Sequence, residues 1–217
     1  MVIGLLTLTS IPTVTGIALG CSEQRKANSR QDDEKRMQKF YTDVECLEDG
    51  EAFDEINEKR AVFRDNKVYI DDPSPEKRKK EAHAGQAFYF HYPEPDHMQD
   101  LKRGLGLVST IQDNPPVLNW LYADKETHEI KYGNRTQSCD HVPAPWDWRD
   151  EETTIVLEKK RWFFAVREEE GEGIWALYLD LDGDEMERVL GEKESLIVPV
   201  RLKRTLVDEP QAVKTGG

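Results

Sequence analysis

From Gln86 onward the chain is divided into short segments of high β propensity that turn-forming residues separate, and this spacing restricts the fold more than any other feature. Short strands with no long helical pattern between them are typical of antiparallel sheets. We therefore expect a mainly β (α+β) domain, an antiparallel meander that forms a sandwich or a partly open barrel. The expected strands cover residues 87–92, 105–111, 117–123, 128–132, 153–157, 162–166, 174–181 and 196–202.

Several of these strands carry more specific signals. Residues 61–70 read as two short strands around a tight Asp65-Asn66 turn. The strand over 174–181 has apolar residues on both faces, which predicts a central strand covered on both sides. Pro199 lies inside the last expected strand and predicts an edge or a bulge there, because proline has no N–H to donate.

Two helices are expected ahead of the sheet. Ser22 suits the N-cap of a charged helix that runs to about residue 42. Ser74 and Pro75 suit the start of a second, short helix that Gly85 would close. The expected organisation is an apolar segment (1–22), a charged helical linker (23–60), the β-rich domain (61–207) and a flexible tail (208–217).

The first 22 residues contain no charged side chain. Three interpretations compete: a secretory signal that lacks its positive n-region, a membrane anchor diluted by Pro12 and glycines, and a segment packed on its own protein. We favour an intracellular, membrane-associated protein with membrane contact through residues 1–21. The alternative is a protein secreted after signal cleavage.

Charge restricts the partners. The formal net charge is -13, and 34% of the residues are charged. A protein that binds nucleic acid needs a cationic surface to neutralise phosphates, so we expect no nucleic-acid partner. The expected partner is another protein or a small apolar ligand.

Aromatic residues supply the candidate ligand-binding positions. Trp146 and Trp148 bracket Asp147 on a proline-rich loop, where alternating side chains can line a pocket or cap the open end of the domain. Trp120 and Tyr132 lie on a hairpin whose spacing is somewhat like that of WW domains, which bind polyproline on an exposed aromatic face. The simpler interpretation is an ordinary hairpin, with the strand tryptophans in the core.

One loop contains residues suited to a transition metal. His91, Glu94, Asp96 and His97 bring two imidazoles and two carboxylates into one short stretch, which are ligands for zinc or manganese. Two prolines hold this stretch extended and no distant ligand is evident, so a polar loop is the alternative. No metal or other cofactor is expected overall.

Two further patterns have structural explanations. Asp180, Asp182, Asp184 and Glu187 resemble the start of a calcium loop, but the EF-hand pattern then fails, and an acidic turn is the better interpretation. Cys139 and His141 pair a thiol with a base only if the fold brings them together. Phosphate-binding loops, nucleophile elbows and zinc-protease motifs are absent from the sequence.

Four strings of the sequence stand out together: MVIGLLTLTSIPTVTG, GLGLVSTI, LNWLYADKETHEIKYGNR and PWDW. On these strings the chain resembles an uncharacterised protein family of filamentous ascomycete fungi. Members usually have Gly-Pro-Trp-Asp-Trp-Thr where this chain has Ala144 and Arg149 at the two ends. The resemblance implies a fungal source and a native N-terminal segment, and it implies no activity.

These patterns contain no catalytic signature. The function we expect is a non-enzymatic interaction or binding protein. The alternative is a β-barrel that binds a small apolar ligand, or an accessory protein in a fungal biosynthetic pathway. Such a barrel needs a cavity, for which Trp120, Phe164 and Tyr178 are the expected lining residues.

Overall fold

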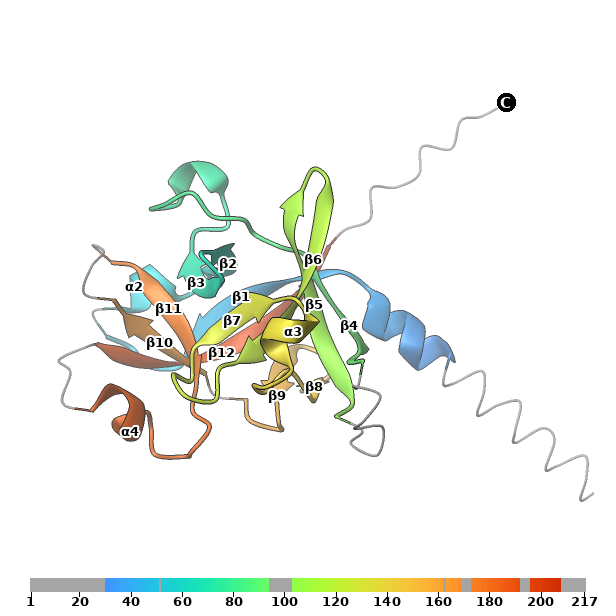
Figure 1. Cartoon of the computed structure of the whole chain (residues 1–217). Coiled ribbons are helices and arrows are strands. Elements are labelled where there is room, and N and C mark those ends of the chain that lie inside the picture. Colours follow the sequence, from blue (N-terminus) through green and yellow to red (C-terminus); the bar gives the residue numbers. More distant parts are fainter. Residues whose placement is uncertain are drawn as a thin grey trace, which may run out of the picture. The chain divides into compact units, whose positions relative to one another are not determined.

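The computed structural model describes residues 30–50, 52–93, 103–161, 163–168, 173–191 and 196–207. The chain divides into two compact units, Met1–Met37 and Gln38–Gly217. In the first, the described part is a helix over residues 30–37. The second contains all the strands, as Figure 1 shows. Among the described residues, no helix combines the length and apolar character that a membrane crossing needs.

The second unit is a 12-stranded antiparallel sheet that closes on itself, because β1 pairs with β12. The strands form three successive groups of four. The first and fourth strand of each group are neighbours around a barrel: β1 pairs with β4, β4 with β5, β8 with β9 and β9 with β12, while β5 lies against β8. These strands are β1 (Phe40–Cys46), β4 (Ala87–His91), β5 (Leu105–Asp113), β8 (Trp146–Arg149), β9 (Thr154–Leu157) and β12 (Ile197–Leu206).

The second and third strand of each group form a hairpin, and the three hairpins meet. β3 pairs with both β7 and β11, and β7 lies against β11. The hairpins are β2 (Arg60–Arg64) with β3 (Lys67–Asp71), β6 (Pro116–Ala123) with β7 (Ile130–Gly133), and β10 (Phe163–Arg167) with β11 (Trp175–Leu179). The mainly β, antiparallel fold is thus confirmed, and it takes the form of a closed barrel covered by hairpins.

Local signals placed the first hairpin correctly. Asp65 and Asn66 both adopt positive φ, 51° and 61°, as a two-residue turn between twisted strands requires. The central position of β11 is also confirmed, since every residue of the strand is buried between β10 and β3.

Two hydrophobic clusters lie on opposite faces of the sheet. The larger one fills the barrel and contains Phe40, Trp146 and Trp175, all nearly inaccessible to solvent. A smaller one covers the outer face of β10 and β11, where the segment after β11 folds back and buries Met186. That segment contains α4 (Glu187–Leu190).

The β-rich part begins earlier than the expected boundary at residue 61. β1 lies inside the stretch expected to be a helical linker, and its alternate residues are buried because it pairs with β12 along its whole length. β8, over Trp146–Arg149, replaces the expected proline-rich loop. Short helices α2 (Phe53–Ile56) and α3 (Arg135–Ser138) lie between strands. The expected tail lies outside the described residues.

The second expected helix is reduced to a single 3-10 turn, Pro75–Lys77. The Ser74 side chain makes no capping hydrogen bond there. Gly85 is required for a different reason: a Cβ atom at this position would lie 2.0 Å from the backbone oxygen of Thr110. The close approach of two backbone segments therefore selects this glycine.

Pro199 lies at a local edge of an otherwise central strand. β12 pairs with β10 over Ile197–Val200 and with β1 from Val200 onward. The β1–β12 ladder ends at Pro199, whose carbonyl oxygen accepts a hydrogen bond from the Leu47 N–H just beyond β1 (3.1 Å). Proline, which has no N–H to donate, thus lies where the regular pairing with β1 stops, and this agrees with the expectation of an edge or a bulge.

Candidate functional site

A cleft of about 660 Å³ opens beside the β9–β10 turn. One wall is this turn, and the opposite wall is the loop that follows β11. The outer faces of β10 and β12 form the apolar side of the cleft. Its volume falls in the range of small-molecule sites. The lining residues are Glu48, Lys159, Lys160, Arg161, Phe164, Asp180, Gly183, Glu185, Ile197 and Pro199.

The β9–β10 turn places cations at the rim. Glu158 and Lys159 adopt positive φ, 51° and 66°, and the backbones of Leu157 and Lys160 exchange hydrogen bonds across the turn. Lys159 therefore lies at the tip of a two-residue turn, and Arg161 follows two positions later, ahead of β10. Both residues are exposed.

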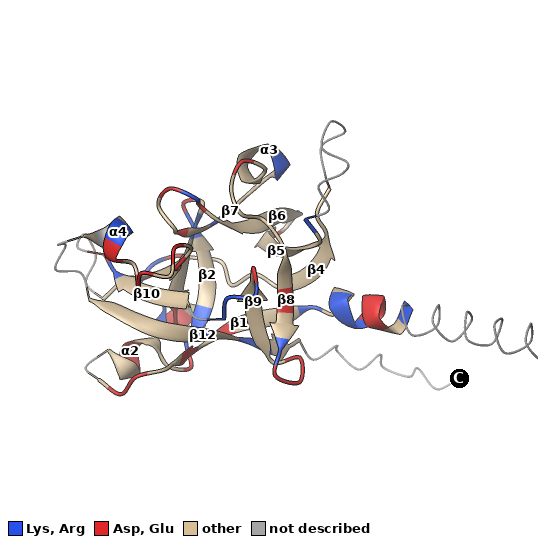
Figure 2. Cartoon of the chain, turned by 90° about the horizontal axis from the view of Figure 1, so that it is seen from below, with Lys and Arg blue, Asp and Glu red and all other residues tan. Residues whose placement is uncertain are grey.

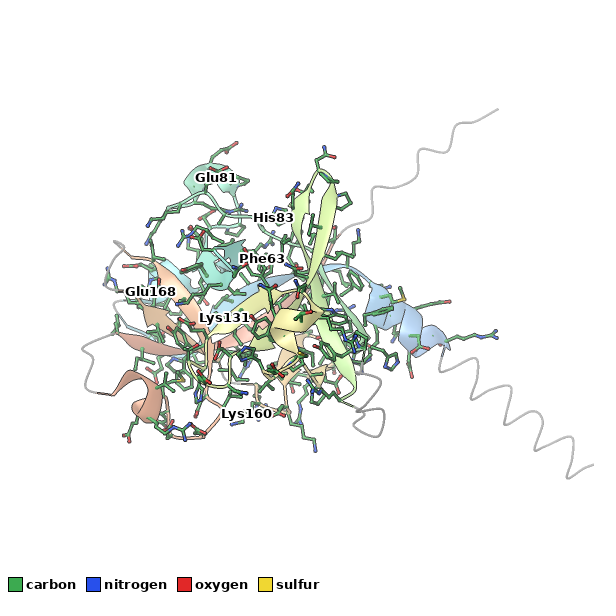
Figure 3. All side chains as sticks on the ribbon, in the orientation of Figure 1. Phe63, Glu81, His83, Lys131, Lys160 and Glu168 are labelled. Carbon is green, nitrogen blue, oxygen red and sulfur yellow. The ribbon has the colours of Figure 1, made fainter. Side chains whose placement is uncertain are left out.

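Lys160 links the two walls. Its Nζ donates hydrogen bonds to the carbonyl oxygens of Asp180 (2.6 Å) and Leu181 (2.8 Å). These carbonyls directly follow β11, so the lysine holds the turn against the loop. Figure 3 shows Lys160 at the lower edge of the molecule, far from Glu81 and His83.

The opposite wall is an acidic turn held by a single carboxylate. The Asp180 side chain accepts hydrogen bonds from the backbone N–H groups of Asp182, Gly183 and Glu185, at 2.7 to 3.1 Å. Burial alone would raise the pKa of Asp180, but these backbone donors outweigh it and lower the pKa below its ordinary value. This carboxylate is therefore committed to the turn.

The register of the β10–β12 pair creates the apolar side of the cleft. Phe164 faces Pro199 and Val166 faces Ile197 across the β10–β12 pair, so their side chains lie on one face of the sheet. Phe164 is 8% exposed and belongs to the outer hydrophobic cluster. A ligand in the cleft would contact this surface.

Four charged side chains in the cleft remain uncommitted. Lys159 and Arg161 have no ion-pair or hydrogen-bond partner among the residues that the structure describes, and the same holds for the carboxylates of Glu48 and Glu185. Lys159 and Arg161 lie two positions apart on one turn, whereas the two carboxylates come from separate segments. The cleft thus combines an apolar surface with a paired cationic rim.

A second group of charged residues lies where the three hairpins meet. Lys67 on β3 donates to Glu129 Oε1 at 2.6 Å and also to Glu168. Lys131 on β7 bridges Glu129 (2.8 Å) and Asp124 (2.9 Å). Figure 3 labels Lys131 and Glu168 in this region. The network connects all three hairpins.

The pKa values in this network are strongly shifted. Burial would raise the pKa of Glu129, but hydrogen bonds from Lys131 and Lys67 lower it to about 2. Burial opposes a similar shift in Asp124, where backbone N–H groups and Lys131 lower the pKa to about 2. Burial raises the pKa of Tyr178, whose hydroxyl donates to Glu129, to about 12. Each charged group of the network has an oppositely charged partner, and the shifts move the pKa values of Glu129, Asp124 and Tyr178 away from 7.

The structure separates the aromatic residues that sequence analysis grouped. Trp120 pairs with Gly133, while Tyr132 pairs with Leu121, so the two aromatic side chains lie on opposite faces of the hairpin. Tyr132 is buried against Phe63. They form no common platform of the WW type.

Trp146 and Trp148 lie on β8, and neither lines the cleft. Trp146 is 1% exposed, and its Nε1 donates to the Leu121 carbonyl oxygen inside the barrel. Trp148 packs edge-on against Tyr89, with the Arg204 guanidinium over its ring. β8 replaces the expected loop, and both rings pack against other aromatic side chains there. Trp162 lies outside the described residues, and Trp175 is buried as expected.

The metal hypothesis finds no support in the described part of the chain. His91 is exposed at the end of β4, and Glu94, Asp96 and His97 lie outside the described residues. Among the residues that are described, no three His, Cys, Asp or Glu side chains are grouped as a metal ion requires.

The thiol and the imidazole proposed as a pair have other contacts. Cys139 Sγ donates to the Thr136 carbonyl oxygen, while the His141 ring stacks on Tyr122. Sequence analysis did not single out Lys159 and Arg161. The available signal was three consecutive cations before an aromatic run, in a chain of net charge -13.

A closed antiparallel barrel built from three four-strand groups and covered by three hairpins is the β-trefoil architecture. The model of the fungal beta-trefoil domain family matches residues 16–208, and the chain belongs to this family. No curated protein and no solved structure matches the chain. The family assignment supports the fungal origin that the sequence resemblance implied.

Proposed function

We propose that this protein is a non-enzymatic binding protein whose ligand is a small molecule with an apolar body, held in the cleft beside the β9–β10 turn. The fold fits a binding or interaction role. The observation that carries the proposal is the meeting of the outer apolar cluster and an open cleft at Phe164. Apolar walls with a few polar groups are typical of small-ligand sites.

The neutral dye N-phenylnaphthylamine tests this proposal by its fluorescence on titration. We expect saturable binding to the full chain and loss of at least about tenfold in affinity in Ile197→Asp, because a carboxylate would then face the apolar body. Val117→Asp is the matched control, since it introduces the same group at an exposed position of β6, outside the cleft. Equal binding by both variants would contradict the proposal.

A second candidate function is binding of a protein partner by the β5–β6 hairpin. Residues 105–123 contain a single charged residue, Asp113, in a chain that is 34% charged. Val117 and Leu118 are 37% and 51% exposed there. Figure 1 shows the far end of this hairpin projecting from the other strands, and Figure 2 shows few charged residues on β5 and β6. An exposed apolar ribbon with a single charged residue near its tip suits an uncharged apolar partner segment.

Site-specific cross-linking tests this second function. A photoreactive group at position 118, introduced in the host, should give a discrete adduct that Val117→Asp removes. The same group at position 77, on the exposed 3-10 turn, is the control. Equal adducts at both positions would argue against a docking surface on the hairpin.

We also propose membrane contact through residues 1–21, since that segment carries no charge. Fractionation of the full chain against a version that begins at residue 22 tests it. The full chain should sediment with membranes and the shortened chain should not. Equal distribution of the two would contradict the proposal.

A further inference from the structure

We propose that the ligand of this cleft is a monoanionic amphiphile, such as a carboxylic acid with an aromatic or aliphatic body. The proposal rests on the proposed function, because it concerns the same site. The anionic group would bind at Lys159 and Arg161. The apolar body would lie on Phe164, Ile197 and Pro199.

The cations are placed for one anionic group. Lys159 lies on the two-residue turn and Arg161 two positions after it, both are exposed, and neither has a partner among the described residues. Lys160 between them is used structurally, because it donates to two carbonyl oxygens directly after β11. Lys159 and Arg161 can therefore bind a ligand, while Lys160 between them cannot. The planar guanidinium of Arg161 suits carboxylates and related groups, because it can donate two parallel hydrogen bonds.

The acids of the cleft limit the charge of the ligand. Glu48 and Glu185 line the same cleft without partners in the described part of the chain. A polyanion such as a nucleotide triphosphate would meet these carboxylates and the field of a chain with net charge -13. A ligand with one negative charge needs only the two cations and adds the least repulsion from these carboxylates. Ligands with several charges are therefore disfavoured.

The apolar side excludes very small anions. Phosphate or acetate would fill little of a cleft of about 660 Å³ and would leave the Phe164 side uncovered. Binding energy in such sites comes mainly from apolar area, while a charged contact fixes orientation. The geometry therefore calls for both parts in one molecule.

The experiment compares two dyes that share one ring system and differ in a sulfonate. Anilinonaphthalene sulfonate carries one negative charge, and N-phenylnaphthylamine carries none. Both are titrated into the full chain, into Lys159→Ala/Arg161→Ala, and into Lys77→Ala/Lys80→Ala. The last variant is the matched control, because it removes two exposed cations elsewhere and gives the same net charge.

We expect the anionic dye to bind the full chain about tenfold more tightly than the neutral dye, since two charge-assisted contacts are added. In the rim variant, Lys159→Ala/Arg161→Ala, the ratio of the two affinities should fall to about one. The control variant should keep the ratio of the full chain. High salt should reduce the ratio in the full chain, because exposed pairs are screened.

The outcomes separate the two proposals. Equal affinity for both dyes in the full chain, or an unchanged ratio in the rim variant, overturns the monoanion inference and leaves the cleft as an apolar site. Absence of binding by either dye overturns the proposed function itself. Unfolding curves of each variant confirm that the compared chains are folded.

Discussion

Lys67 on β3 donates a 2.6 Å hydrogen bond to Glu129, which directly precedes β7, although the two residues are 62 positions apart in the chain. Only 12% of the lysine side chain and 18% of the glutamate side chain are exposed. Tyr178, from the third hairpin, donates to the same glutamate oxygen. One carboxylate thus contacts residues from all three hairpins.

Replacing Lys67 with methionine should destabilise the fold by about 2–4 kcal/mol, because Glu168 would lose this cation and the largely buried Glu129 would keep Lys131 alone. Urea unfolding measures the change. The double variant Lys67→Met/Glu129→Gln should lose less than the single one, since the buried charge is then removed. If Lys67→Met loses less than about 0.5 kcal/mol of unfolding free energy, the Lys67–Glu129 pair contributes no more than an exposed salt bridge.

Acid should weaken the fold through Glu129. Its pKa falls from an ordinary 4.5 to about 2 on folding, so the unfolded chain binds more protons between these values. The stabilisation is complete above about pH 5 and is lost as the pH falls through 4.5 toward 2. The parent chain should lose stability between pH 7 and pH 3, and Glu129→Gln should lose roughly 1–2 kcal/mol less over the same range. This figure is reduced from the full pKa shift because the Glu129 side chain is partly exposed to solvent. Equal pH dependence in both would contradict this assignment.

Trp146→Ala should cost about 3–5 kcal/mol of stability, because a fully buried indole stacked on Phe163 would leave a cavity. Thermal or urea unfolding measures it. Dye affinity of the folded fraction should stay the same, since Trp146 does not line the cleft. A loss of dye affinity with unchanged stability would restore Trp146 as a binding residue.

Asp180→Ala should release the acidic turn, because several backbone N–H groups lose their shared acceptor. We expect hydrogen exchange at Gly183 and Glu185 to accelerate at least about tenfold. Asp180→Asn keeps an acceptor oxygen, so its exchange rates should lie between those of the parent chain and those of Asp180→Ala. Unchanged exchange in Asp180→Ala would show that the turn is held by other contacts, such as Lys160.

Added calcium offers a separate check on the same turn. The Asp180 carboxylate is occupied by backbone donors, so calcium at millimolar concentration should not shift the unfolding midpoint. A clear upward shift that Asp182→Asn removes would establish the calcium interpretation instead.

The sequence by itself determined the strands whose signals are local. The Asp65-Asn66 turn tolerates positive φ, and the apolar run of β11 has no exposed face, so both features were recognisable without the fold. β1 was missed although Phe40, Thr42, Val44 and Cys46 alternate inward, because a threonine interrupts the apolar pattern and a charged helix precedes it.

Only the tertiary structure decided the site. Period-two alternation says which residues share a face of one strand, but it does not say which strands become neighbours. Register placed Trp120 and Tyr132 on opposite faces, and barrel closure buried Trp146. The cleft brings Lys159, Phe164 and Asp180 together with Glu48 and Ile197, which lie far away in the sequence. They meet because β10 lies between β11 and β12 in the sheet. Such non-local packing arises from burial of the whole sheet, which no single segment of the sequence specifies.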